Sequence, residues 1–277
     1  MKHCYWIIAL ALLLGACGKQ EPAAPVADEP AAIEEPVAEE QPAEEPADTS
    51  DEVVEVVEES AAEPEPEEQE IILAQAEVPA APAEWKYREG QHFVRIVPAQ
   101  PTVGGPDKVE VAEFFYYLCP HCNTIEPIID GWEQNKPANS RLVKIPTMWN
   151  NVLVLHARMF YSMEALARNG TIDDGAAVHK AIFDEIHRRG NRLASEASIM
   201  RLFARFGVSE ADFDRVWNSF EVDQKLRVAQ DLARRYGVSS TPTIVVNGKY
   251  RTSAGDAGSY SNLLELIDEL ILRESLR

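Results

Sequence analysis

The fold of this 277-residue chain is decided by Val109-Glu110-Val111-Ala112-Glu113-Phe114-Phe115-Tyr116-Tyr117-Leu118, which runs directly into Cys119-Pro120-His121-Cys122. The first of these segments is largely apolar and aromatic, which predicts a buried strand. Proline suits the first turn of a helix because its missing N–H would be unpaired there. The two cysteines are therefore predicted to stand at a strand-to-helix junction. A cysteine pair in this position can exchange electrons with another dithiol.

The N-terminus carries the features of an export signal. Met1-Lys2-His3 precedes an apolar run from Tyr5 to Leu14, which leads into Leu14-Gly15-Ala16-Cys17. A run of about ten residues matches a secretory signal and is too short for a membrane-spanning helix, which needs roughly 20. The Leu-Gly-Ala-Cys ending resembles a bacterial lipoprotein signal. Residues 1–17 would then be a signal that ends at Cys17, and Cys17 would carry the lipid and become the mature N-terminus. An ordinary signal cleaved elsewhere, or an uncleaved anchor, is the alternative.

Residues 18–83 form a segment rich in Pro, Ala and Glu. It holds 21 acidic residues between Glu21 and Glu77 and no Lys or Arg there, whereas 84–277 holds 25 acidic and 24 basic residues. The formal net charge of −20 therefore belongs to this segment, and it argues neither for nor against an acidic catalytic surface. With ten of the eighteen prolines and no aromatic residue, it cannot bury enough apolar area to offset its ordering entropy. We predict a disordered acidic linker.

Residues 84–277 show strand and helix patterns in a mixed order. After a short strand near 93–97 and the strand 109–117, we expect a helix at 123–135, a strand at 141–146, a block of helices from about 152 to 218, a helix at 222–236, a hairpin of 243–246 and 249–251, and a final helix at about 259–272. Asn247-Gly248 supplies the hairpin turn. This order predicts an α/β domain of α+β character, in which a small sheet carries helices and a helical insertion.

Three other roles for the cysteine pair compete with redox exchange. A tetrahedral zinc site needs four ligands, and the chain has no second CxxC, so His156, His179 or His187 would have to join the pair. Covalent haem attachment needs a histidine after the second cysteine, where this chain has Asn123. A disulfide between such close residues closes too small a loop to stabilise a fold strongly. We therefore expect no metal and no cofactor.

Several motifs together resemble the DsbA family of thiol:disulfide oxidoreductases. They are Glu113-Phe114-Phe115 before the CPHC, then Gly237-Val238-Ser239-Ser240-Thr241-Pro242-Thr243, and finally Val246-Asn247-Gly248-Lys249-Tyr250. The resemblance spans about residues 85–275 and covers both halves of a thioredoxin-like fold. It implies that the block of helices between the halves is that family's helical insertion.

The CPHC residues have distinct expected roles. Cys119 stands at a helix N-terminus, where unpaired N–H groups and a partial positive charge favour its thiolate, and His121 would add to this effect. Because a stabilised thiolate favours the reduced form, the disulfide becomes a stronger oxidant, the direction known for DsbA itself. We assign Cys119 as the exposed, attacked sulfur, Cys122 as the buried, resolving sulfur, and Pro120 as part of the same catalytic turn.

Three positions outside the motif complete the expected site. The resemblance implies that Pro242 is cis and faces the disulfide, leaving the Thr241 main chain free to pair with a substrate, although a trans proline at the start of a strand is common. Alternation places Glu113 on the face of a buried strand. The resemblance implies that it handles the proton of Cys122, with Arg141 or Lys144 as possible neutralising partners. Glu126 lies one helical turn after Cys122 and is either a tuning group or a solvated carboxylate.

The resemblance implies a periplasmic enzyme that introduces disulfides into exported proteins and is reoxidised by a quinone-linked membrane partner resembling DsbB. A lipid on Cys17 would hold it at a membrane, and Gly18 in place of aspartate favours the outer one. The alternatives are a reductase or isomerase of the same fold, or a lipoprotein that only binds peptides or a chaperone. No nucleic-acid partner is expected.

Overall fold

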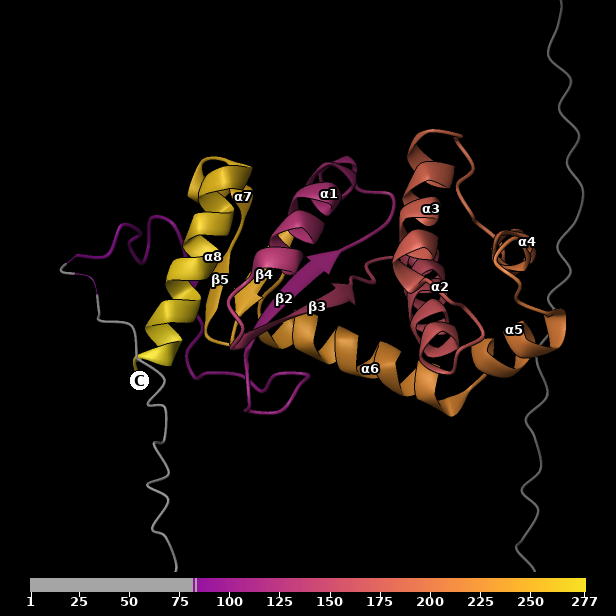
Figure 1. Cartoon of the computed structure of the whole chain (residues 1–277), viewed down its shortest axis with the longest axis horizontal. Helices are drawn as coiled ribbons and strands as arrows, with labels where there is room; N and C mark the ends of the chain where they lie inside the picture. The colour runs from indigo at the N-terminus through magenta and orange to yellow at the C-terminus, as the bar shows by residue number, and fades with distance from the viewer. Residues whose placement is uncertain (1–81, 83) are drawn as a thin grey trace, which may run out of the picture. The chain divides into compact units, whose positions relative to one another are not determined.

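The structure is a computed structural model that describes residues 82 and 84–277 (Figure 1). The expected signal at 1–17, the Cys17 lipid site and nearly all of the 18–83 segment lie outside the described residues. Within the described part, no helix is both long and apolar enough to cross a membrane.

A five-stranded mixed sheet forms the centre of the domain. Its order is β1-β5-β4-β2-β3, built from β1 (Val94–Arg95), β2 (Val109–Phe115), β3 (Ser140–Pro146), β4 (Thr243–Val246) and β5 (Tyr250–Thr252). β2 pairs in parallel with β3 and antiparallel with β4, whereas β5 pairs antiparallel with both β4 and β1. The apolar run at 109–115 forms a central strand, and because it has neighbours on both edges its main-chain polar groups are paired within the sheet.

Helices cover both faces of this sheet. On one face, α1 (Pro120–Asn135) and α8 (Tyr260–Ser275) enclose a cluster that includes Val111, Ile129 and Leu266. On the other face, α6 (Phe220–Arg235) contributes to a second cluster that includes Phe114 and Leu232. The short helix α7 (Ala254–Ala257) precedes α8. The alternation of β2 thus divides its side chains between two apolar layers, as the period of a strand requires.

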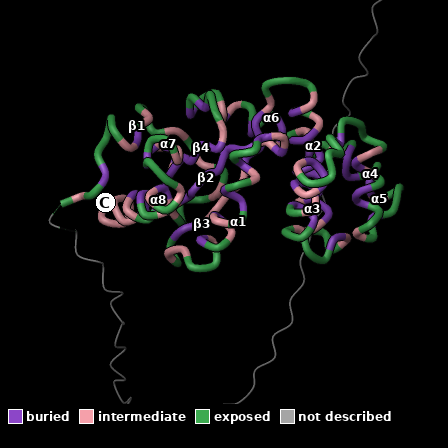
Figure 2. The backbone as a smooth tube through the Cα atoms, turned by 90° about the horizontal axis from the view of Figure 1, so that it is seen from above, coloured by how far each residue is buried: buried purple, intermediate pink, exposed green. Residues whose placement is uncertain are grey.

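Four helices lie between β3 and α6 and form the helical insertion. They are α2 (Asn151–Arg168), α3 (Gly175–His187), α4 (Glu196–Ala204) and α5 (Glu210–Trp217), and side chains at Asn150, Asp174, Ser195 and Ser209 cap their N-termini. Each cap accepts a hydrogen bond from a main-chain N–H that the helix itself leaves unpaired. The insertion lies beyond the end of β2 (Figure 1), and buried segments run through its helices as they do through β2 and β4 (Figure 2).

The mixed sheet with its helical insertion is the fold class expected from the sequence, and the differences are at element ends. β2 ends at Phe115 rather than residue 117, because the chain turns there: the Cys119 N–H donates to the Tyr116 carbonyl at 3.0 Å. The first helix starts at Pro120 rather than residue 123, because Cys119 caps it. The strand expected near 93–97 contracts to Val94–Arg95.

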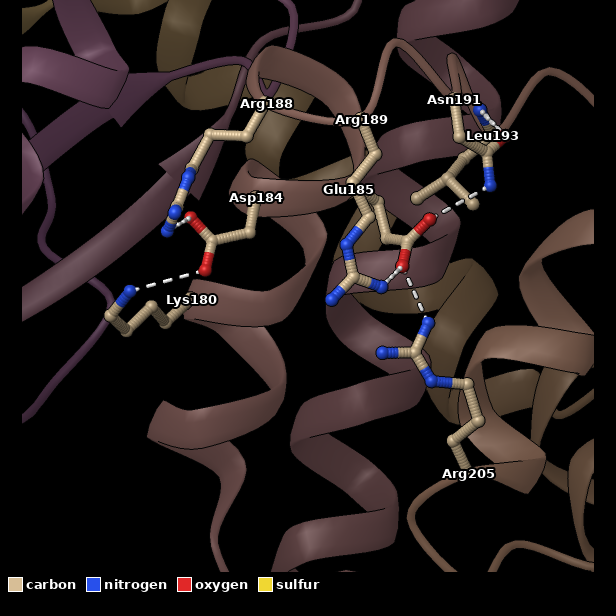
Figure 3. Close-up of polar contacts among 8 residues, drawn as sticks. All are labelled: Lys180, Asp184, Glu185, Arg188, Arg189, Asn191, Leu193 and Arg205. Atoms are coloured by element: carbon tan, nitrogen blue, oxygen red, sulfur yellow. Dashed lines mark hydrogen bonds and ion pairs between the residues drawn. The ribbon is translucent and has the colours of Figure 1, made fainter.

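A buried carboxylate fixes the C-terminal part of α3. Figure 3 shows Arg189 and Arg205 converging on Glu185, whose side chain is only 7% exposed. Arg189 lies 2.6 Å away and Asn191 donates to the same carboxylate at 3.1 Å. The hydrogen bond from Arg205 lowers the pKa of Glu185, with Asn191 and Arg189 adding to the effect. Since Arg205 caps the end of α4, these contacts join two helices of the insertion.

Candidate active site

Cys119 occupies the N-cap of α1, so its sulfur replaces the oxygen that usually fills this position. The Cys122 N–H points at Cys119 Sγ across 3.4 Å, and Cys119 has the extended main chain of an N-cap residue. Pro120 follows at the first helical position, where it needs no hydrogen-bond partner. The helix end therefore presents its unpaired N–H groups to this one sulfur.

The two thiols differ strongly in acidity. Contact with the Cys122 thiol, supported by the Thr241 side chain and the N–H groups of Cys122 and His121, lowers the pKa of Cys119 to about 5 from 9.0, against the opposing effect of burial. Burial, together with the neighbouring Cys119, raises the pKa of Cys122 far above its ordinary value. At neutral pH the first sulfur is therefore a thiolate and the second a thiol. Both cysteines are free in this structure.

The expected exposure of Cys119 is wrong. Its residue surface is only 3% exposed, against 0% for Cys122. Thr241 contributes to this burial, since its carbonyl lies 3.6 Å from Cys119 Sγ. The two thiols therefore differ in acidity more than in accessible surface.

His121 lies on the exposed side of α1, as does Pro120. Its main-chain N–H is one of the groups that lower the pKa of Cys119. The described part of the chain shows no hydrogen bond from the His121 imidazole to either sulfur. The contribution visible here is thus that of the main chain.

The Thr241–Pro242 peptide bond is cis, as the resemblance implied, and a second cis bond at Val97–Pro98 was not expected. The Thr241 carbonyl faces Cys119, and its buried hydroxyl has no hydrogen-bond partner within the described residues. β4 begins directly after this segment at Thr243. The Thr241–Pro242 segment therefore places a main-chain carbonyl beside Cys119 Sγ, the sulfur that a substrate would attack.

Glu113 is completely buried, and neither of its carboxylate oxygens has a hydrogen-bond partner among the described residues. It lies opposite Lys144 in the register of β2 and β3 and opposite Ile244 in that of β2 and β4. Burial first, and then the negative charge of Glu126, raise the pKa of Glu113 from 4.5 to about 8, while Lys144 opposes this rise. At neutral pH Glu113 is largely protonated, so its carboxyl can release or take up a proton close to the end of β2.

Glu126 is not a solvated carboxylate. It is 5% exposed and forms an ion pair with Lys144, and its Oε1 lies 2.9 Å from His179 Nε2. Although burial alone would raise it, these two neighbours lower the pKa of Glu126 to about 2. Lys144 also contacts Asp130 at 3.1 Å, whereas Arg141 pairs with Asp107. Of the two cations considered for Glu113, only Lys144 belongs to this buried group.

Two members of the site were not identified from the sequence as parts of it. Tyr117 precedes the CPHC, and His179 lies on α3. The sequence offers His179 only as a candidate metal ligand; within residues 84–277 no group of His, Cys, Asp and Glu is arranged to hold a metal ion. A polar residue within an apolar helix stripe, such as His179 next to Val178 and Ile182, was the available signal.

A cavity lies along α6. This cavity of about 540 Å³ is lined by Met148, Trp149, Arg227 and Val238 together with other α6 residues. Trp149 is 48% exposed and meets the ring of Tyr116 edge-on at 5.8 Å between centroids. This cavity is large enough to hold side chains of a bound polypeptide.

A thiolate and a thiol held two residues apart at a helix end can exchange with another disulfide, and the fold around them is the thioredoxin-like one. The fold and the site thus define a thiol:disulfide oxidoreductase. The family model described as DSBA-like thioredoxin domain matches residues 110–268, and the chain belongs to this family.

Relatives agree with this assignment. The thiol:disulfide interchange protein DsbA of Pseudomonas aeruginosa is 36% identical over 188 residues, which cover 68% of this chain and 86% of that protein. The protein of the same name from Burkholderia cepacia is 33% identical over 199 residues, covering 72% and 88%. The crystal structure of Pseudomonas aeruginosa DsbA superposes with a TM-score of 0.63 at 34% identity, covering 68% of this chain and 94% of that one. DsbA from Xylella fastidiosa gives 0.62 at 26% identity, covering 69% and 99%.

Proposed function

We propose that this enzyme works as an oxidant that introduces disulfide bonds into exported proteins through Cys119 and Cys122. The observation that supports the proposal is the unequal acidity of the two thiols, with the pKa of Cys119 lowered to about 5 and that of Cys122 raised. Stabilising one thiolate stabilises the reduced pair, so the disulfide form gives up its bond readily.

The exchange proceeds in two displacements. A substrate thiolate attacks Cys119 Sγ of the disulfide form, a mixed disulfide forms, and Cys122 leaves as a thiolate that takes up a proton. A second substrate thiolate then attacks the substrate sulfur of the mixed disulfide, which releases the Cys119 thiolate. The substrate loses two electrons and its two thiol protons in forming its disulfide, and the Cys119–Cys122 pair gains the two electrons.

Neighbouring residues would assist each displacement. The low pKa of Cys119 makes it the better leaving group in the second step. Glu113, buried and with its pKa near 8, would supply the proton that Cys122 takes up. The Thr241 carbonyl beside Cys119 Sγ would orient an extended substrate chain through main-chain hydrogen bonds.

A redox titration against glutathione tests the direction of electron flow. The full-length protein should come to equilibrium in a mixture dominated by oxidised glutathione. If it equilibrates only in strongly reducing mixtures, the enzyme works as a reductase or isomerase instead. Insulin reduction tests catalysis itself: Cys119→Ala should abolish the activity, and equal activity in this variant would favour a protein that only binds peptides.

We also propose that the enzyme acts in the periplasm on reduced exported proteins, with a DsbB-like, quinone-linked membrane oxidase as the acceptor of its electrons. The lipoprotein-like signal that ends at Cys17 supports attachment to a membrane by lipid, and Gly18 after it favours the outer membrane. Labelling with a radioactive fatty acid and fractionation of cells check this. Cys17→Ala should lose the label and leave the membrane fraction, and a variant still found there with no lipid would contradict the attachment.

Deletion of residues 21–80 tests whether the acidic segment lets a protein anchored at one membrane reach a partner at the other. Loss of reoxidation in cells, with unchanged insulin reduction in vitro, is the expected result. Normal reoxidation would show that the segment has another role.

A further inference from the structure

Helix α3 of the insertion contacts the segment before the CPHC motif at two points. Its His179 Nδ1 lies 2.6 Å from the Tyr117 hydroxyl, and its His187 Nε2 lies 2.7 Å from the Tyr117 carbonyl. Tyr117 is fully buried and stands two residues before Cys119. One helix of the insertion therefore holds both the side chain and the main chain of this residue.

His179 also reaches the helix that follows the cysteines. Its Nε2 lies within 2.9 Å of Glu126 Oε1, within ion-pair distance but without the alignment of a hydrogen bond, and each side chain is 7% exposed. Glu126 is one turn after Cys122 on α1 and also pairs with Lys144. The imidazole is thus placed between Tyr117 and Glu126, one on each side of the CPHC motif in the sequence.

We propose that His179 is a positioning residue for the exchange reaction, which the helical insertion supplies to hold the Glu126 carboxylate against Lys144, one helical turn after Cys122. The proposal rests on exchange at Cys119 and Cys122, and it does not depend on the direction of electron flow.

The chemistry of the three groups fits this role. Burial raises the pKa of Tyr117 well above its ordinary value, so its hydroxyl stays protonated and pairs with His179 Nδ1. The other ring nitrogen, Nε2, faces the Glu126 carboxylate. Tyr117 therefore helps to fix the orientation of the ring that brings Nε2 to Glu126.

Packing keeps the ring in place. His179 meets the rings of Phe115, Phe160 and Phe183 at centroid distances of 5.5, 5.7 and 5.3 Å. The contacts of Glu185 with Arg189 and Arg205 hold the same helix from its other end (Figure 3). An aromatic enclosure of this kind leaves the imidazole few alternative rotamers.

The electrostatic surroundings of His179 come from four elements. A cavity of about 520 Å³ beside it is lined by Asp130 and Glu133 from α1, Lys144 from β3, Glu164 and Arg168 from α2, and Lys225 from α6. Glu126 contacts the ring directly, whereas the others line the cavity. The contact to Glu126 is thus the one through which His179 should act on the redox pair.

The test measures the equilibrium constant of the full-length protein with glutathione at pH 7. His179→Phe keeps the aromatic packing and removes both nitrogens, and Tyr117→Phe in the same chain avoids an unpaired hydroxyl. The matched control is His187→Gln, which lies on the same helix and also contacts Tyr117 but not Glu126. Each variant is also made in a Glu126→Gln background, so that the coupling can be read from a double-mutant cycle.

We expect Tyr117→Phe/His179→Phe to change the equilibrium constant by about threefold or more, and by less than about twofold once Glu126 is glutamine. His187→Gln should have the same small effect in both backgrounds. His179→Gln retains an N–H donor and should restore the constant to within about twofold of the native value. Equal effects of the His179 change in both backgrounds, or no recovery with glutamine, would show that the residue only supports packing.

The pH dependence of the equilibrium constant with glutathione gives a second readout that packing alone would not change. Loss of the His179 contact should move the inflection that Glu126 causes at acidic pH upward by about one pH unit. An inflection that stays at its native pH in Tyr117→Phe/His179→Phe would overturn the proposal.

Discussion

Replacing Glu113 with glutamine should stabilise the reduced protein, and the gain should grow with pH. Burial raises the pKa of Glu113 to about 8 from 4.5. A carboxyl with a raised folded-state pKa costs nothing below the unfolded value, and its cost increases as pH rises from 4.5 toward 8. At pH 7 the folded protein holds a proton on Glu113 that the unfolded chain has released, because pH 7 lies about 2.5 pH units above the unfolded-state pKa of 4.5. Keeping this proton costs about 3 kcal/mol of folding free energy.

Urea unfolding of the reduced protein between pH 4 and 8, followed by tryptophan fluorescence, measures the difference between Glu113→Gln and the native protein. The two free energies of unfolding should agree near pH 4, and the variant should be more stable by about 3 kcal/mol at pH 7. A difference that is the same at every pH would refute the reasoning, because the gain would then come from packing and not from the proton.

Glu126→Gln is the matched control, since the same group of charges lowers the pKa of Glu126 to about 2. Its carboxylate stabilises the fold above the unfolded value of 4.5, and this contribution is lost as pH falls toward 2. The variant should therefore be less stable than the native protein by about 3 kcal/mol at pH 7 and equally stable near pH 2. The two neighbouring carboxyls thus have opposite signs in one assay.

Two further predictions concern the thiol and the insertion. The ultraviolet absorbance of the Cys119 thiolate should rise with a midpoint near pH 5, and the step should be absent in Cys119→Ala; a midpoint near 9 would contradict the role of the helix end. Glu185→Ala should lower the free energy of unfolding by about 1–2 kcal/mol, because it removes the ion pairs of this carboxylate with Arg189 and Arg205. The loss stays this small because both arginines are half exposed and remain hydrated in the variant. An unchanged urea midpoint for that variant would show that these ion pairs do not hold α3.

The parts of the site that follow from sequence are those with local signals. The CPHC motif at the end of an apolar run predicted both the strand and the helix that Cys119 caps. The resemblance of the segment around Thr241-Pro242 to the DsbA family implied the cis bond, which is present. Strand alternation indicated that Glu113 would be buried, and it is completely so. Each depends on neighbours in the chain or on a short motif.

The parts that did not follow depend on how distant elements pack. Whether Glu126 is solvated is decided by α3 and β3, since His179 and Lys144 lie on those elements and cover it. Thr241, which is 122 residues away in the sequence, likewise contributes to the burial of Cys119. Helix periodicity shows which face is apolar, but it does not show which residue of another helix will meet a given carboxylate.

The pairing of β2 has a consequence for the order in which the fold forms. Its edge with β3 needs only the intervening α1, whereas its edge with β4 closes a loop that contains the whole insertion and α6. Closing so long a loop is slow compared with local helix and strand contacts. The CPHC dithiol therefore spends the early part of folding without the Thr241–Pro242 segment, and the chain becomes competent for exchange only when β4 and β5 join the sheet.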